Sequence, residues 1–367
     1  DQRSRYGLAI KNLCEELALH LGSIDSEIRP KIERFAKLVF LNKGIYDGWS
    51  QRKIAPGFSF EELEIAARAA KKSGARFPSV KTDADLKRFL GSLHRILFDA
   101  QFESIGVTKS PPVGKDLVTA SAATYYDGLR YSDISAYHET YALNSRVSKH
   151  GRRIVENVYR AGRAGTPSVP KGLYAEQLGA IVDSLRRARA FGSDSQKTAL
   201  DHLIAFFETG EPAAFHNFNV AWVGDDSRVD SILGFIESYG DPRGVHAEFE
   251  GLVFAKDQAR SSMMSRLAGF APDFEKSMPF LDQYKRDSFR PPIATAVQVL
   301  ALSGGALPVT PAGINLPNEQ AIRQNQGSKS FFLSSVDDAA SSIYSKAIVA
   351  EFLFHPDKMA EFKRCLP

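Results

Sequence analysis

The stretch GFIESYGDPRGVHAEFEG, residues 234–251, constrains the fold of this chain more than any other. It contains the turn sequence Asp-Pro, followed by Gly, between β-like runs at 230–236 and 248–255. Two such runs joined by a turn favour a hairpin-like pair of strands, in which residues two apart lie on the same face. We therefore expect paired strands here, with the turn between them.

Acidic side chains gather in the same stretch, and they are Glu237, Asp241, Glu248 and Glu250. On strands, Glu237 and Tyr239 share a face, and so do Glu248 and Glu250. Several carboxylates on a half-buried face repel one another unless a cation joins them. The pairing of the strands is therefore expected to bring a cation-binding group of carboxylates together.

The sequence leaves the cation open. It can be Arg243, His246, a metal ion or the ammonium group of a ligand. Alternatively, the carboxylates lie on a solvent-facing edge of a sheet and pair with arginines of their own.

A second polar pair, Asn315 and Asn318, flanks Pro317 in the segment PAGINLPN, residues 311–318. The segment is too rich in Pro and Gly to be expected as a regular element, and the run AVQVL before it is expected as a strand. The two amides either hold a turn by local hydrogen bonds or bind the backbone of an extended peptide.

Helices are expected in the first hundred residues. Ser59 and Glu62, and then Thr82 and Asp85, have the spacing of helix-capping boxes, and each pair precedes an amphipathic run. Further along, a hairpin is expected around His150-Gly151, because a Val- and Ile-bearing strand follows the turn. Later helices are expected over 174–191, 195–208 and 337–365, the last with a break at His355-Pro356.

Composition excludes several classes of protein. The net charge is +4 over 367 residues, without a basic stripe, so nucleic-acid binding is not expected. No apolar run is long enough to span a membrane. The cysteines, Cys14 and Cys365, lie at opposite ends of the chain, which favours a reducing compartment; we expect the cytoplasm, with the periplasm as the alternative. His138-Glu139 begins like a zinc motif, but Ala142 stands where the second histidine is needed, so no metal ligand is expected in this chain.

Two long motifs resemble the dipeptidyl peptidase III family of zinc exopeptidases. GFIESYGDPRG is followed by EFEG, and GINLPN is followed by IRQNQGSKS, in the order and spacing of that family. SRVD before the first motif fits its bacterial branch, and LNSRV and VENVYRAG are similar to its middle section. The resemblance is strong over 220–335 and weak in the first hundred residues.

The resemblance implies an α+β fold, mostly helical and two-lobed, with a small mixed β-barrel or sheet lobe. It divides the chain into three parts. These are a helical N-terminal region of the β-barrel lobe (1–135), the β-barrel core with the substrate-binding elements (136–335), and a helical segment leading toward a zinc lobe (336–367).

The resemblance also implies roles for individual residues. Glu237 binds the N-terminal ammonium group of a peptide, with Asn315 and Asn318 sharing this work. Tyr239 is implied as the catalytic residue that hydrogen-bonds the scissile carbonyl and stabilises the oxyanion. Glu250 lies in the same acidic face. Such a site measures two residues from a free N-terminus, which is the requirement of a dipeptidyl peptidase.

The zinc motifs of the family are absent from this chain. The resemblance therefore implies the substrate-binding part of a zinc-dependent metallo-exopeptidase that releases dipeptides from short peptides. Zinc and its ligands are expected in a C-terminal zinc-bearing part of the same protein, and the chain alone is expected to be inactive. Two alternatives stay open: a zinc-free, non-catalytic peptide-binding protein on the same scaffold, or a structural partner of another subunit.

Overall fold

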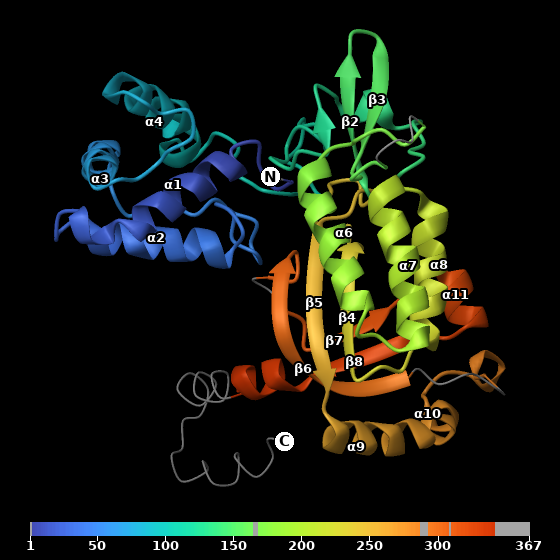
Figure 1. Cartoon of the computed structure of the whole chain (residues 1–367). Coiled ribbons are helices and arrows are strands. Elements are labelled where there is room, and N and C mark those ends of the chain that lie inside the picture. The colour runs from blue at the N-terminus through green and yellow to red at the C-terminus, as the bar shows by residue number, and fades with distance from the viewer. Residues whose placement is uncertain (1, 164–167, 287–292, 308–309, 342–367) are drawn as a thin grey trace.

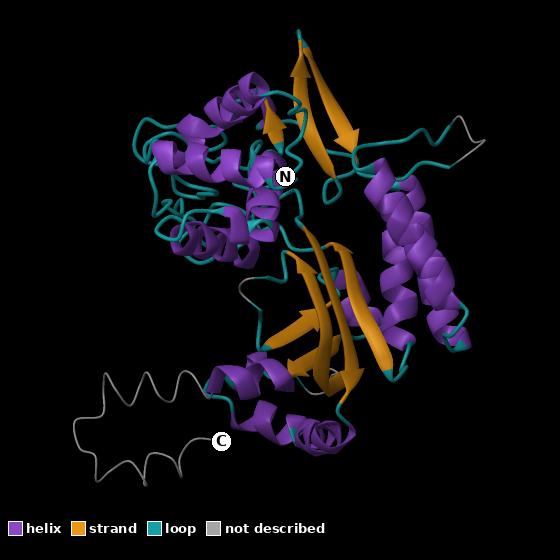
Figure 2. Cartoon of the chain, turned by 60° about the vertical axis from the view of Figure 1, so that its left-hand side comes forward, coloured by secondary structure: helices purple, strands orange, loops and turns teal. Residues whose placement is uncertain are grey.

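The computed structural model describes residues 2–163, 168–286, 293–307 and 310–341 (Figure 1). Four helices from the first hundred residues stand beside a strongly curved β-sheet, and a β-hairpin stands at the end of the molecule opposite helix α9. Three further helices run along the sheet, as Figure 2 shows from a second direction. The expected α+β class is confirmed.

The N-terminal helices form where the capping pattern predicted them. Their bounds are Gly7–Leu19 (α1), Arg29–Leu41 (α2), Phe60–Lys72 (α3) and Asp83–Phe98 (α4), with a short 3₁₀ helix at Leu21–Ser23. The side chains of Ser59 and Thr82 accept from the backbone N–H groups of Glu62 and Asp85, whose carboxylates bond back to the capping residues. Both capping boxes are therefore confirmed, and the apolar faces of the four helices meet in one core.

The expected hairpin is also confirmed. Strands β2 (Ser145–His150) and β3 (Arg153–Val158) pair in antiparallel register, and Gly151 turns between them with a φ of 63°. Such a φ lies in the left-handed region, which favours glycine because a Cβ would come close to the backbone of its own residue. A two-residue strand, β1 (Tyr126–Asp127), runs parallel to β2, and the short helix α5 (Tyr131–Ile134) follows it.

The larger sheet has five strands in the order β4-β5-β6-β8-β7. Their bounds are Val229–Phe235 (β4), Phe249–Lys256 (β5), Ile293–Gly304 (β6), Gly313–Leu316 (β7) and Lys329–Leu333 (β8). Strands β4 and β5 are antiparallel, with Gly234 opposite Glu250, whereas β6 and β8 are parallel. The expected strand pair around the Asp-Pro turn is therefore confirmed, within a mixed sheet.

Strand β7 corrects one prediction. The segment 311–318 was expected to be irregular, but Gly313–Leu316 pairs antiparallel with β8 at the edge of the sheet. An edge strand tolerates this composition because, among the described residues, one side of its backbone pairs with no other strand, and Pro317 follows directly after the last paired residue. Helix α11 (Gln320–Asn325) then leads into β8.

Three helices cover one side of the sheet. Helices α6 (Ala175–Arg189) and α7 (Asp194–Thr209) fall where sequence periodicity predicted them. Helix α8 (Pro212–Gly224) was missed, although Pro212 near its start and buried residues at helical spacing are a readable signal. The buried residues of this spacing are Phe215, Phe218, Asn219, Trp222 and Val223. The three helices and the sheet share one hydrophobic core.

The segment between β5 and β6 contains helices α9 (Gln258–Gly269) and α10 (Ala271–Ser277) and a short 3₁₀ helix at Asp282–Tyr284. At the other end, residues 334–341 are helical, in keeping with the expected start of the helix over 337–365. The predicted break at His355-Pro356 lies outside the described residues.

No helix in the described ranges has both the length and the apolar character needed to cross a bilayer. The cytoplasmic location and the division of the chain at 1–135, 136–335 and 336–367 stay predictions.

Candidate functional site

A cavity of about 540 Å³ lies beside the end of the curved sheet. All five residues predicted for the site line it, and they are Glu237, Tyr239, Glu250, Asn315 and Asn318. They come from the loop after β4, the start of β5, and β7 with the residues after it. The sheet brings these distant segments together because β4 pairs with β5, and β7 is carried by β8.

The loop after β4 corrects a detail of the prediction. Strand β4 ends at Phe235, so Glu237 and Tyr239 do not share the face of a strand. They lie in a loop of which Asp241 organises the second half. The Asp241 carboxylate is fully buried and accepts from the backbone N–H groups of Arg243, Val245 and His246 at 2.8–3.0 Å.

Asp241 is therefore a structural carboxylate and not a member of the acidic group in the cavity. It also accepts a hydrogen bond of 2.8 Å from the Tyr126 hydroxyl. Four donors satisfy its charge inside the protein, which is the condition for burying a carboxylate.

The two protein cations offered by the sequence are engaged elsewhere. Arg243 binds the buried carboxylate of Glu139 at 2.5 Å. His246 is fully buried between Tyr125 and Tyr126, and its desolvation lowers the pKa of the imidazole. Neither residue lines the cavity, so neither neutralises the carboxylates there.

One carboxylate of the group has a protein partner that sequence reasoning missed. Glu248 accepts two hydrogen bonds from Arg3, at 2.6 Å to Nε and 3.0 Å to Nη2. The two residues are 245 positions apart in the chain, and no spacing signal connects them. The alternative prediction, that the carboxylates pair with arginines of the protein, is therefore correct for Glu248 alone among the three glutamates of the cavity.

Glu237 and Glu250 lack such a partner. In the described part of the chain, no Lys, Arg or His forms an ion pair with either carboxylate. Glu237 accepts a hydrogen bond of 3.1 Å from the Asn318 amide. Burial, and then the negative charges of Glu237 and Glu248, raise the pKa of Glu250 to about 7. The pair is therefore a site of unneutralised negative potential in a hollow of the surface.

Tyr239 stands at the rim of the same cavity, with 74% of its surface exposed. The charge of Glu237, followed by partial burial and a hydrogen bond with Glu237, raises the pKa of the phenol. The hydroxyl therefore stays protonated at neutral pH and is available as a hydrogen-bond donor. Trp49, 79% exposed, also lines the cavity and was missed by the sequence analysis.

Asn315 lies on β7, exposed, and its amide donates to the Ser330 hydroxyl on β8 at 2.9 Å. Its side chain therefore bonds across the sheet and not within its own turn. The amide of Asn318 reaches Glu237, across 81 positions of the sequence. Both observations disfavour a purely local turn-holding role for these residues.

The residues directly after β6, which are Gly305, Ala306 and Leu307, form another wall of the cavity. Gly304 has a φ of 60°, and a Cβ there would lie 2.0 Å from the Phe249 carbonyl oxygen. Gly305 bonds to the same carbonyl at 2.8 Å and brings its backbone against Glu248. Glycine is thus required where the chain turns directly over the first residues of β5.

The zinc implied by the resemblance does not fit the described residues. Within those ranges, no group of three or more His, Cys, Asp or Glu side chains is placed to hold a metal ion. No chemical step is therefore assigned to a metal in this part of the protein.

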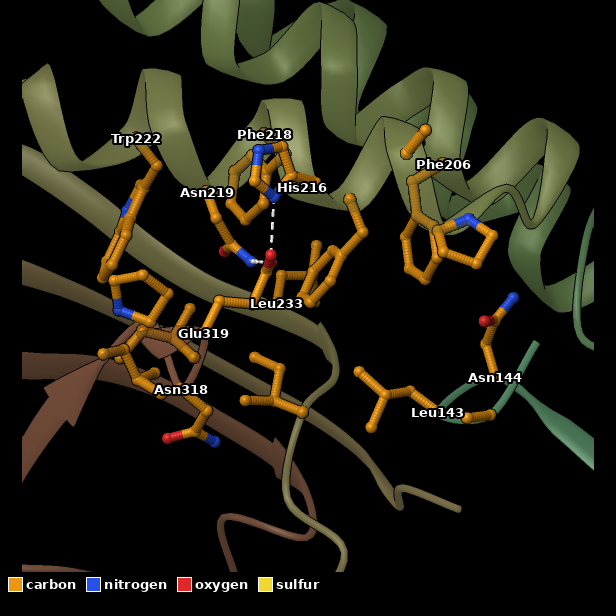
Figure 3. A pocket seen from close by; sticks show the side chains of 18 of the residues that line it. Leu143, Asn144, Phe206, His216, Phe218, Asn219, Trp222, Leu233, Asn318 and Glu319 are labelled. Atoms are coloured by element: carbon orange, nitrogen blue, oxygen red, sulfur yellow. Dashed lines mark hydrogen bonds and ion pairs between the residues drawn. The ribbon is translucent and has the colours of Figure 1, made fainter. Parts of the chain in front are cut away.

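A second cavity, of about 390 Å³, lies between helix α8 and strand β4 (Figure 3). Aromatic side chains such as Phe218 and Trp222 form its walls. Its carboxylate, Glu319, already has partners, since Asn219 donates to it at 3.0 Å and the His216 Nδ1 lies 2.6 Å away. The first cavity, with its two unpaired carboxylates, is therefore the better candidate for binding a cation.

Comparison with known proteins identifies the family. The sequence pattern of peptidase family M49 matches residues 138–365, more than half of the chain. The chain belongs to peptidase family M49. The resemblance to the dipeptidyl peptidase III family is thereby confirmed.

The family relatives are similar over part of their length. Dipeptidyl peptidase 3 of Nematostella vectensis is 36% identical over 179 residues, covering 48% of this chain and 24% of the relative. The human dipeptidyl peptidase 3 is 36% identical over 175 residues, covering 47% of this chain and 23% of the relative. The matched region spans about a quarter of the length of these relatives.

A solved structure extends the likeness to nearly the whole chain. The structure of a DPP III from Caldithrix abyssi superposes with a TM-score of 0.58 at 18% identity, covering 98% of this chain and 60% of that one. At this identity the superposition supports the fold, including the helical N-terminal region in which sequence similarity is weak.

Proposed function

We propose that this chain is the substrate-binding part of a zinc-dependent dipeptidyl peptidase that acts on short peptides with a free N-terminus. The observation that carries the proposal is the pair Glu237 and Glu250. Both carboxylates line one cavity without a cationic partner among the described residues. Membership of family M49 supports a peptide as the ligand.

In this proposal Glu237 receives the N-terminal ammonium group, and Glu250 adds negative potential behind it. An ammonium group donates three hydrogen bonds and favours a site where carboxylates are already oriented. Asn318 orients Glu237 through their 3.1 Å hydrogen bond, so its role is to position the carboxylate as well as to contact the peptide. The proposed role of Asn315 is to bond the peptide backbone, and its exposure on edge strand β7 supports this role.

Tyr239 is the proposed catalytic residue. Its protonated hydroxyl lies in the same cavity as the ammonium site, at the exposed rim. A donor there stabilises the negative charge that develops on the carbonyl oxygen of the bond being cut. The fixed relation of Glu237 to Tyr239 then determines how far from the N-terminus cleavage occurs.

The proposed partner for catalysis is a zinc-bearing part of the same protein. Zinc would supply a Lewis acid and an activated water. The residues described here would hold the peptide in register and exclude alternative bonds.

The decisive experiment is a comparison of two probes, tetra-alanine and N-acetyl-tetra-alanine, by isothermal titration calorimetry with the 367-residue chain. Acetylation removes the positive charge and leaves the rest of the peptide intact. We expect acetylation to weaken binding by about 10- to 100-fold, which corresponds to one charge-assisted hydrogen bond. Equal affinities for the two peptides would refute the ammonium site.

A second measurement separates the proposed enzyme from a non-catalytic peptide-binding protein. Tetra-alanine is incubated with zinc and the full protein that contains this chain, and the products are separated by chromatography. Release of di-alanine supports the enzyme, whereas binding without release supports the peptide-binding alternative.

A further inference from the structure

The first described residues of the chain form part of the wall of the candidate site. The Gln2 side chain makes two hydrogen bonds to the backbone at the start of β5. It donates to the Ala247 carbonyl at 3.0 Å and accepts from the Phe249 N–H at 2.9 Å. The Gln2 carbonyl is held in turn by the backbone N–H of Thr124 at 2.9 Å. Residues 2 and 3 are therefore fixed against the start of β5, which carries Glu250 and is directly preceded by Glu248.

Because residues 2 and 3 are held in this way, the Arg3 side chain reaches the carboxylate of Glu248. Its Nε and Nη2 atoms bind the two oxygens of Glu248 at 2.6 and 3.0 Å, and Nη1 donates to the Asn42 carbonyl at 3.1 Å. The side chains of Arg3 and Glu248 are only 19% and 18% exposed. A bidentate pair that is held from a third direction and shielded from water does not release its carboxylate readily.

We propose that Arg3 is a positioning residue that reserves Glu248 for the protein, so that a bound ammonium group meets only Glu237 and Glu250. This inference rests on the proposed function and adds a residue to it. Arg3 acts through Glu248 and does not need to touch the peptide.

The other groups around the site make such a residue necessary. The titratable side chains among the described residues that line the cavity are Arg3, Glu237, Tyr239, Glu248 and Glu250. Arg3 is the one cation of this set. Without it, three carboxylates would share one cavity, and their repulsion would be relieved by taking up protons. A protonated carboxyl attracts an ammonium group less than a carboxylate does, so binding would be lost near neutral pH.

The test follows the affinity for tetra-alanine from about pH 5 to pH 7.5, where the peptide amine stays largely protonated. In the wild-type chain we expect the affinity to rise through a midpoint near 7, where Glu250 loses its proton. Glu248→Gln removes one repelling charge and should move this midpoint down by about one pH unit. Arg3→Met leaves Glu248 unpaired and should move the midpoint up by about the same amount, beyond the upper end of this range, so the affinity of this variant at pH 7 should fall below that of the wild type.

The double variant, Arg3→Met with Glu248→Gln, tests whether Arg3 acts through Glu248 or independently of it. If Arg3 acts through Glu248, its removal raises the midpoint less in the Glu248→Gln background than in the wild type, because the carboxylate that it neutralises is already absent. Arg3→Lys keeps the charge but makes one contact in place of two, so its midpoint should fall between those of the wild type and Arg3→Met. The proposal is overturned if Arg3→Met weakens binding by the same factor at every pH and does so again in the Glu248→Gln background.

A measurement without peptide keeps this test separate from the proposed function. The carboxyl carbon of Glu250 is titrated by carbon-13 NMR in each variant, with circular dichroism as the check on folding. Opposite shifts of its midpoint in Arg3→Met and Glu248→Gln support the role of Arg3 even if acetylation of the peptide has no effect. Unchanged midpoints refute it even if the free amine is preferred. If Arg3→Met does not fold, the role of Arg3 is tested by comparing the Glu250 midpoints of Arg3→Lys and Glu248→Gln, which should again shift in opposite directions.

Discussion

Replacing Glu237 with Gln tests the central carboxylate with the smallest change of shape. At about 3 Å and an effective dielectric constant of about 20, an ammonium–carboxylate pair attracts by roughly 5 kcal/mol. Loss of water from both charges offsets most of this energy, and a hydrogen bond to a charged group contributes about 1.5–3 kcal/mol net. Glu237 is half-buried and already accepts from Asn318, so we expect the substitution to weaken tetra-alanine binding by about 10- to 100-fold.

The assay is calorimetry with both tetra-alanine and its N-acetyl form. Glu237→Gln should weaken binding of the free peptide and leave binding of the acetylated peptide unchanged. The acetylated peptide has no ammonium group, so it makes no ion pair with Glu237 that the substitution could remove. Glu33→Gln, a substitution of a half-buried glutamate on α2 outside the cavity, is the matched control and should change neither affinity. The reasoning is refuted if Glu237→Gln weakens both peptides equally, since the residue would then act on the shape of the site and not on the ammonium group.

Other predictions follow from the same geometry. In an assay of the proposed dipeptide release, Tyr239→Phe should lower kcat about 10²–10³-fold with little change in KM, and an unchanged kcat would exclude the oxyanion role. Asn318→Ala should weaken tetra-alanine binding by about 3- to 10-fold, because Glu237 loses the amide that orients it; calorimetry would contradict this if the affinity stayed the same. Glu250 has a pKa near 7, above the value of an unfolded chain, so the folded state holds an extra proton between about pH 4.5 and 7 and the free energy of unfolding falls as the pH rises through this range. Urea unfolding at pH 8 should therefore find Glu250→Gln more stable than the wild type by up to about 3 kcal/mol, and equal stability at that pH would mean that the carboxyl is not perturbed. Gly304→Ala should reduce stability by about 2–3 kcal/mol in thermal unfolding, because its φ is 60° and the new Cβ would lie 2.0 Å from a carbonyl oxygen of β5. Gly269→Ala, whose Cβ meets nothing within 4 Å, is the control and should be nearly neutral or slightly stabilising.

Sequence patterns were sufficient for several elements whose deciding interactions are local, although they did not lead to helix α8. The capping boxes at Ser59 and Thr82 and the turn at Gly151 each depend on residues a few positions apart, so the corresponding helices and hairpin could be predicted. The motifs around Glu237 and Asn318 identified the family because their residue order is itself the signal.

Long-range pairing decided the rest. Strand β7 could not be predicted from 311–318, because its backbone is ordered by pairing with β8 and not by its own propensity. In the sequence, Asp241 is indistinguishable from the other acidic residues. In the structure, its carboxylate is buried and accepts hydrogen bonds from four donors. A linear pattern contains no information on burial of this kind, since burial depends on what packs from elsewhere.

The sequence by itself predicted an acidic site with Glu237, Glu250, Asn315, Asn318 and Tyr239, and these five residues line one cavity in the structure. The tertiary structure decided which carboxylates are free. Arg3 neutralises Glu248 from 245 positions away, and Glu237 and Glu250 are left without a counter-charge among the described residues. Charge is a property of residue type and can be read from a sequence, but neutralisation depends on distance, which only the folded chain determines.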